Sequence, residues 1–130
     1  MALGELMCTT VDVNDLAVAE RFWSAVTGWP VTLSRWNEQY SAVGDEDSSL
    51  LLQLVPETKT VKNHMHLDFR VQDVAQAVRE VIELGGSVVK PPSVTRTWGD
   101  GSVPAEAPDG PTLEWAVVAD PYGNEFCVVK

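Results

Sequence analysis

The sequence predicts an α+β fold built from two tandem βαβββ modules, and three observations point to it. A chain of 130 residues, 45% hydrophobic and 22% charged, has the size and composition of one soluble globular domain. The chain matches itself without a gap at an offset of 58 residues. Each copy begins with a strand pattern, continues with a helical pattern and ends with three more strand patterns. We therefore predict a single domain over 1–130, with modules at about 5–58 and about 63–130.

The internal repeat is carried by residues of similar type in the same order. Chance would produce a few such matches, but here they run in sequence with the same local pattern. The matched pairs are Met7 with Met65, Val11 with Phe69, Val13 with Val71, Asp15 with Asp73, Leu16 with Val74, Ala19 with Ala77, Arg21 with Arg79, Val26 with Leu84, Gly28 with Gly86 and Val31 with Val89.

The first module opens with an alternating strand, in which Thr9, Val11 and Val13 share one face and Cys8, Thr10 and Asp12 share the other. Asp15 is suited to cap the N-terminus of the helix that follows, and Gly28 is suited to end it. The apolar stripe of that helix consists of Leu16, Ala19, Trp23 and Val26. Three strands are predicted after it, at about Val31–Trp36, Gln39–Val43 and Leu50–Val55.

The second module repeats this plan. Leu67, Phe69 and Val71 oppose His66, Asp68 and Arg70 on the opening strand. Asp73 is the predicted N-cap, Gln76 could complete a capping box, and Gly85-Gly86 ends the helix. The predicted helical stripe consists of Val74, Ala77, Val78, Val81 and Ile82. The later strands are predicted at about Ser87–Lys90, Leu113–Ala119 and Glu125–Val129.

Two segments between strands have turn or loop chemistry. The run from Asp120 to Asn124 contains the Asp-Pro-Tyr-Gly-Asn signal of a hairpin turn. The stretch 91–111 contains five prolines and three glycines, so we expect an irregular loop there. Such a loop could cover one end of a ligand site, or it could be a surface excursion without a role.

One helix covers only one face of a four-stranded sheet, so the other face of each module needs a neighbour. We expect the two uncovered faces to confront each other around a cleft. The continuous apolar set lies under the helix in each module, with Leu50, Leu52, Leu54, Phe126 and Val128. The alternating residues are predicted to face the cleft, among them Leu51, Gln53, Val55, Glu125, Cys127 and Val129.

Charge, cysteine content and hydropathy exclude several classes of function. Nine basic and nineteen acidic residues give a net charge of -10, which disfavours binding to nucleic acid or to an anionic membrane surface. Two cysteines cannot build a disulfide scaffold. No segment approaches the ~20 apolar residues of a membrane span, and the first residues lack the features of a secretion signal. We therefore expect a cytoplasmic protein.

The strand-to-cap runs Val13-Asn14-Asp15-Leu16 and Val71-Gln72-Asp73-Val74, and the C-terminal run Asp120-Pro121-Tyr122-Gly123-Asn124-Glu125-Phe126, resemble the vicinal-oxygen-chelate superfamily. This group contains glyoxalases, bleomycin-resistance proteins and extradiol dioxygenases. The resemblance covers nearly the whole chain and is greatest to small glyoxalase-like proteins. It implies paired βαβββ modules with a ligand cleft, often in a homodimer.

The resemblance also implies four positions where metal-using relatives carry ligands, namely Cys8, Gln53, His66 and Cys127 in this sequence. Only His66 keeps a usual ligand type, and both carboxylate positions are lost. A divalent ion used as a Lewis acid prefers oxygen and imidazole ligands, so we expect no metal cofactor here. Two thiolates, one imidazole and one amide could still hold zinc, and Cys8 and Cys127 could equally be small buried hydrophobes.

Three further residues are candidate ligand contacts. Asp68 and Arg70 share the predicted cleft face, where Arg70 either pairs with a carboxylate or orients an anionic or carbonyl-bearing ligand. Trp115 belongs to a strand whose alternate residues face the cleft, and Trp36, Tyr40 and Trp98 lie near its expected rims. Aromatic walls suit a flat or apolar small molecule.

These residues support one leading function and two alternatives. The leading hypothesis is a metal-free protein that binds an apolar or aromatic small molecule at Cys8, Gln53, His66, Asp68, Arg70, Trp115 and Cys127. The second is a divalent-metal-dependent lyase, isomerase or dioxygenase of the same superfamily. The third is a structural or regulatory dimer whose cleft has no ligand.

Overall fold

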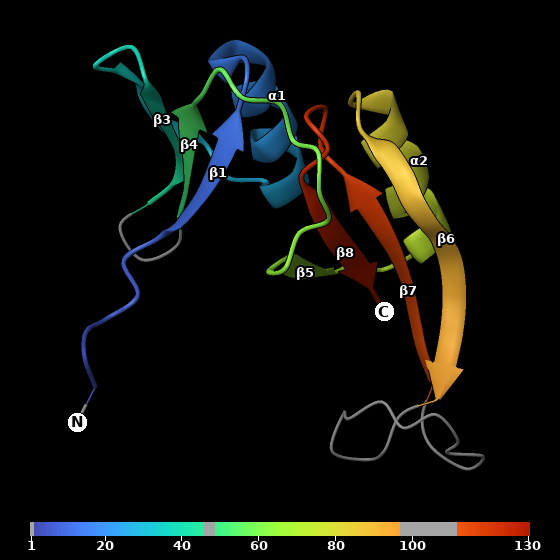
Figure 1. Ribbon diagram of the computed structural model, residues 1–130. Coiled ribbons are helices and arrows are strands. Elements are labelled where there is room, and N and C mark those ends of the chain that lie inside the picture. The colour runs from blue at the N-terminus through green and yellow to red at the C-terminus, as the bar shows by residue number, and fades with distance from the viewer. Residues whose placement is uncertain (1, 46–48, 97–111) are drawn as a thin grey trace. The chain divides into compact units, whose positions relative to one another are not determined.

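The protein is described here from a computed structural model that covers residues 2–45, 49–96 and 112–130. The chain divides into two compact units, Met1–Thr60 and Val61–Lys130, and each is described by itself. Figure 1 shows the helices and strands of both units.

The first unit contains one helix and a four-stranded mixed sheet. Its strands are hydrogen-bonded in the order β1-β4-β3-β2, with β1 and β4 parallel and the other neighbours antiparallel. Its elements are β1 (Thr9–Val13), α1 (Leu16–Thr27), β2 (Val31–Trp36), β3 (Tyr40–Gly44) and β4 (Ser49–Leu54).

The second unit repeats this topology. Its sheet has the order β5-β8-β7-β6, with β5 and β8 parallel, and α2 packs against β6, β7 and β8 (Figure 1). Its elements are β5 (Leu67–Arg70), α2 (Val74–Glu83), β6 (Ser87–Arg96), β7 (Thr112–Ala119) and β8 (Glu125–Val129). The predicted α+β fold with two βαβββ modules is therefore confirmed, and the same strand order in both units explains the sequence repeat.

Both helices begin at the aspartates that the sequence predicts as N-caps. A carboxylate oxygen of Asp15 accepts from the Val18 amide at 3.0 Å, and one of Asp73 accepts from the Gln76 amide at 2.9 Å. The predicted capping box in α2 is wrong, because the Gln76 side chain instead donates to Glu80 one turn later, at 2.8 Å. Gly28 ends α1 in the left-handed conformation, with φ of 74°.

The helices bury most of the predicted apolar stripes. In α2, Val74, Val78 and Val81 are buried, whereas Ile82 is half exposed because it lies one residue further round the helix than Val81. The prediction that Ile82 belongs to the core is therefore wrong. In α1, Phe22 joins Leu16, Ala19 and Trp23 in the core, and Val26 is only partly buried. The T-shaped packing of Phe22 on Trp23 completes this cluster.

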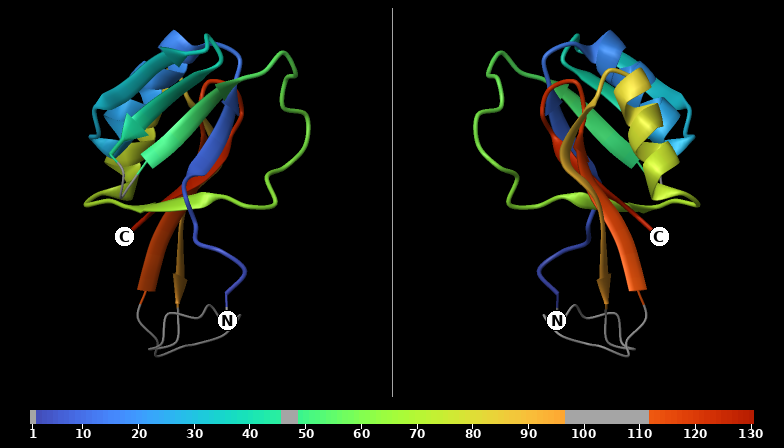
Figure 2. Two further views of the ribbon diagram at one scale, coloured as in Figure 1. Left: turned by 90° about the vertical axis from the view of Figure 1, so that its left-hand side faces the viewer. Right: turned by 90° about the vertical axis from the view of Figure 1, so that its right-hand side faces the viewer.

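The strand β6 is longer than the sequence pattern predicts. We expected the strand to stop at Lys90 and a loop to begin at Pro91, but β6 continues to Arg96 through both prolines. Proline cannot donate to a sheet ladder, yet β6 is an edge strand, and register shifts flank Lys90 on both sides. Figure 2 shows β6 and β7 running together as a long two-stranded ribbon. The rest of the predicted loop, 97–111 with Trp98, lies outside the described residues.

The turn before β8 is organised by the buried side chain of Asp120, which is 2% exposed. Its carboxylate accepts from the Tyr122 amide at 2.8 Å, from the Asn124 amide at 2.9 Å and from the Asn124 side chain at 2.8 Å. The Asp-Pro-Tyr-Gly-Asn run from Asp120 to Asn124 is thus a structural turn that positions the start of β8.

No helix in the described part of the chain is long and apolar enough to cross a membrane.

Candidate functional site

The second sheet has one face under α2 and one face directed away from it. Ala116, Val118 and Phe126 are fully buried, and Phe69 packs edge-to-face against Phe126 with ring centroids 5.6 Å apart. Side chains alternate between the faces of a strand, so the residues between these positions lie on the other face, which we call the α2-distal face. Its described residues include Asp68, Arg70, Lys90, Trp115, Val117, Glu125, Cys127 and Val129.

Strand register arranges the α2-distal face in rows across the sheet. One row contains Asp68, Cys127, Val117 and Lys90, in the order β5, β8, β7, β6. The adjacent row contains Arg70, Val129, Trp115 and Ser93. The predicted parity of β5, β7 and β8 is therefore correct. Predicted site residues from three strands share one surface.

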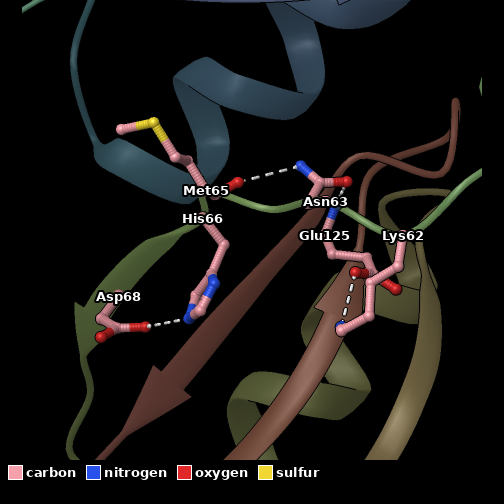
Figure 3. Close-up of polar contacts among 6 residues, drawn as sticks. All are labelled: Lys62, Asn63, Met65, His66, Asp68 and Glu125. Atoms are coloured by element: carbon pink, nitrogen blue, oxygen red, sulfur yellow. Dashed lines mark hydrogen bonds and ion pairs between the residues drawn. The ribbon is translucent and has the colours of Figure 1, made fainter.

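Three potential ligand groups converge at the β5 end of this surface. Donor atoms of His66, Asp68 and Cys127 all lie within 4.8 Å of one another. The Nε2 atom of His66 is 3.4 Å from Oδ1 of Asp68, and both side chains are substantially exposed (Figure 3). Cys127 is only 8% exposed. We call these three residues the thiol cluster.

The Cys127 thiol is held in its protonated form. Burial raises its pKa from 9.0 to about 11, and the hydrogen bond and the negative charge of Asp68 act in the same direction. At neutral pH the thiol is therefore a hydrogen-bond donor to Asp68, not a nucleophilic thiolate. This surrounding is unlike that of a reactive cysteine, which requires a lowered pKa.

Two polar contacts tie the segment before β5 to the start of β8. Lys62 donates to Glu125 at 2.9 Å, and the Asn63 side chain accepts from the Glu125 amide at 3.4 Å. Asn63 also donates to the carbonyl of Met65 at 3.3 Å. Figure 3 shows these contacts around the backbone that leads to His66. They anchor the backbone that places His66 beside Asp68 and Cys127 in the thiol cluster.

An indole platform lies further along the same face. The Nε1 group of Trp115 donates to the Thr95 hydroxyl at 3.0 Å, which fixes the orientation of the ring. The Nζ atom of Lys90 lies 4.0 Å from the ring centroid, a cation–π contact. Trp115 is half-buried, so its indole combines a fixed apolar surface with an adjacent cation.

Arg70 lies at the end of β5 and is exposed. It makes no ion pair with any residue that the structure describes. It contributes to a surface hollow of about 320 Å³ beside the N-terminus of α2, which Asp73, Gln76 and Glu80 also line. Arg70 is therefore a cation available to an anionic group.

Cys8 and Gln53, the remaining predicted ligand contacts, belong to the first unit. Cys8 precedes β1, where its Sγ atom lies 4.0 Å from the hydroxyl of Thr10. Gln53 pairs with Asp12 on β1 and with Tyr40 on β3, and it is partly buried. Both cysteines are free. The contact of Cys8 and Gln53 with a ligand stays a prediction.

Sequence reasoning missed Lys90 and Thr95 because the two prolines suggested that the strand ends at Lys90. The alternation of Ser93, Val94 and Thr95 was the available signal for a longer strand. Sequence reasoning placed Asp68 on the predicted cleft face but did not predict that its carboxylate contacts His66 and Cys127. The register between the parallel strands β5 and β8 decides the contact of Asp68 with Cys127, and no local pattern reveals that contact.

The thiol cluster fits a soft or borderline divalent metal in the type and number of its donors. One imidazole nitrogen, one carboxylate oxygen and one sulfur match the ligands of zinc, and three protein ligands leave a fourth position for water or substrate. Binding requires loss of the Cys127 proton, which the raised pKa opposes. Asp68 supplies a carboxylate, although both carboxylate positions implied by the family resemblance are lost in this sequence.

Comparison with known proteins places the sequence of this chain in a family. A family model described as a glyoxalase-like domain matches residues 8–129. No curated protein sequence matches the chain.

Solved structures share the fold at low sequence identity. A fosfomycin resistance protein, FosX, from Mesorhizobium loti has a TM-score of 0.68 at 17% identity, with 100% of this chain and 93% of that chain covered. A glyoxalase-related enzyme from Fulvimarina pelagi has a TM-score of 0.65 at 20% identity, with 98% and 88% covered. A glyoxalase/bleomycin resistance protein/dioxygenase family enzyme from Burkholderia phytofirmans has a TM-score of 0.63 at 18% identity, with 97% and 98% covered. At these identities the likeness shows the fold alone.

Proposed function

The chain belongs to the glyoxalase-like domain family, and on that premise we propose that it binds a small aromatic molecule on the α2-distal face of its second sheet. The observation that carries the proposal is the fixed indole of Trp115 on the same face as the thiol cluster. An apolar ring can stack on the indole while polar atoms of the ligand reach the donors of the cluster.

The polar end of this site works without a metal. At neutral pH the Cys127 thiol carries its proton, and Nε2 of His66 lies 3.4 Å from Oδ1 of Asp68. These groups offer a ligand both hydrogen-bond donors and acceptors at an exposed position beside a buried strand. We expect the protein to act as a homodimer, which the family resemblance implies and which light scattering of the purified protein tests. A cytoplasmic location is the expectation from its cysteine content and hydropathy.

The test is a calorimetric titration of the whole protein with naphthalene derivatives, using 2-naphthamide and 2-naphthoate as probes. Trp115→Leu removes the indole and is expected to weaken binding about tenfold, equivalent to ~1.4 kcal/mol. Trp29→Leu makes the same chemical change in the first unit and is the matched control, with affinity expected to stay unchanged. Absence of binding by both probes, or equal affinity in Trp115→Leu and the unmodified protein, refutes the proposed function.

A second candidate function is that of a divalent-metal-dependent lyase, isomerase or dioxygenase. The spacing of the donor atoms in the thiol cluster supports it. His66, Asp68 and Cys127 would hold the ion, which would supply a Lewis acid to polarise a substrate oxygen. The chain's own contribution would be to release the Cys127 proton and to orient the imidazole through the segment that Lys62 and Asn63 anchor.

Titration with Co²⁺ discriminates between the two candidates, because a thiolate–cobalt bond gives a charge-transfer band in the near ultraviolet. A stoichiometric band that disappears in both Cys127→Ser and His66→Ala favours the metal-dependent function. Absence of the band up to millimolar Co²⁺ at pH 8 excludes it and leaves the metal-free proposal in place.

A further inference from the structure

We propose that the ligand is an aromatic anion, an arene bearing a carboxylate or a similar acidic group, and that Lys90 is the residue that selects it. This inference rests on the proposed function, since it names the class of molecule that the same surface binds. The structure assigns Lys90 to the site through its contact with Trp115, whose ring the ligand would also use.

The placement of Lys90 results from irregular pairing along β6. Lys90 pairs with Val117, and register shifts occur both before it, after Val88, and after it, before Ser93. Such bulges rotate a side chain away from its regular position, and Pro91 holds the backbone immediately after it. The ammonium group consequently lies 4.0 Å from the centroid of the Trp115 ring. Trp115 belongs to the next residue pair of the ladder, in which it faces Ser93.

The ammonium group of Lys90 has no carboxylate partner within the described residues. Asp68, the acidic residue of its own row, is three strands away, about 14 Å at the usual strand spacing. That separation exceeds the Debye length of ~8 Å at physiological ionic strength. Lys90 shares this lack of a described carboxylate partner with Arg70, but Lys90 alone of the two lies against the indole of Trp115.

An aromatic anion satisfies both parts of this arrangement. Its ring can lie against the indole, and its acidic group can accept from the ammonium, which keeps the cation–π contact intact. A neutral arene gains only the ring contact and leaves the ammonium without a counter-charge. Arg70 lies in the row of Trp115 by strand register but is separated from it by β8, so Lys90 is the cation that contacts the indole.

The experiment compares 2-naphthoate with its neutral isostere 2-naphthamide by calorimetry at 50 mM and 300 mM salt. The unmodified protein is expected to bind the anion at least about tenfold more tightly than the amide at low salt, as one charge-assisted hydrogen bond allows. This preference should shrink at high salt. Lys90→Gln should abolish the preference by weakening only naphthoate binding, and Lys90→Arg should retain most of it.

Arg79→Gln is the matched control, because Arg79 is an exposed cation of α2 in the same unit. It is expected to leave both affinities unchanged, and circular dichroism confirms that each variant is folded. Equal binding of the two probes by the unmodified protein, or an equal loss of preference in Arg79→Gln and Lys90→Gln, overturns the aromatic-anion proposal while the proposed function stands. If neither probe binds, the proposed function itself fails.

Discussion

Asp68 and Cys127 are partners across the parallel pair β5 and β8, and the carboxylate of Asp68 helps to hold the Cys127 thiol in its protonated form. The contact joins two residues 59 positions apart in the sequence. It gives the α2-distal face a polar end whose thiol donates a hydrogen bond at neutral pH and is not a nucleophile.

The Cys127 thiol is expected to resist alkylation. In a Cys8→Ser background Cys127 is the only cysteine, so reaction with iodoacetamide reports on it alone. A pKa of about 11 in place of 9.0 lowers the thiolate fraction at pH 8 roughly a hundredfold. Asp68→Asn should raise the rate, since burial remains but the carboxylate's effect on the pKa is removed. Glu83→Gln is the control, and a rate profile with its midpoint near pH 9 contradicts the assignment.

The same thiol makes stability depend on pH in the alkaline range. Its folded pKa is raised, so its contribution is fully present below pH 9 and is lost as the pH rises toward about 11. The free energy of unfolding of the Cys8→Ser protein should therefore fall between pH 9 and 11 more steeply than that of Cys8→Ser/Cys127→Ser. Urea denaturation at pH 8, 9, 10 and 11 measures the difference, and parallel curves would count against the raised pKa.

His66 is expected to serve the ligand and not the core. Its side chain is 46% exposed, so His66→Ala should change the midpoint of thermal unfolding by less than about 3 °C. Loss of one polar contact should weaken naphthoate binding about threefold. Differential scanning fluorimetry and calorimetry on one preparation give both values. A large drop in thermal stability would instead assign the imidazole to folding.

Asp120→Ala is expected to destabilise the protein by about 3 kcal/mol, because it leaves buried donors of the turn without their acceptor. Asp120→Asn keeps one side-chain oxygen as an acceptor and should recover part of this loss. Urea denaturation followed by circular dichroism measures both variants. Stability equal to that of the unmodified protein in Asp120→Ala would show that the carboxylate does not organise the turn.

Gly86 is expected to tolerate no side chain. A Cβ atom there would lie 2.4 Å from the carbonyl oxygen of Ala119 and 2.6 Å from a methyl group of Val81. Gly86→Ala should therefore cost about 2 kcal/mol of stability through overpacking between α2 and β7. Gly4→Ala, with no atom within 4 Å of its added methyl, is the control that should change nothing. Equal unfolding midpoints for the two variants would contradict this close approach.

Sequence patterns predicted the elements that depend on short-range physics. The alternation at Val11 and Val13, the capping carboxylates of Asp15 and Asp73 and the left-handed stop at Gly28 act within a few residues, so they are legible locally. The repeat at an offset of 58 residues then predicted the second module from the first. The Gln76 side chain departed from the predicted capping box because it bonds to Glu80, one turn later. Ile82 departed from the predicted core because its position on the helix turns it toward the exposed side.

By itself, then, the sequence determined two copies of a strand–helix–sheet unit and which strand faces are apolar, since both follow from backbone period and composition. Only the tertiary structure decided what meets across the strands of the second sheet. Parallel pairing of β5 with β8 places Asp68 beside Cys127, and the bulged edge strand β6 carries Lys90 and Thr95 to Trp115. Register and bulges arise from pairing between distant segments, and that long-range choice created the surface to which we assign the ligand.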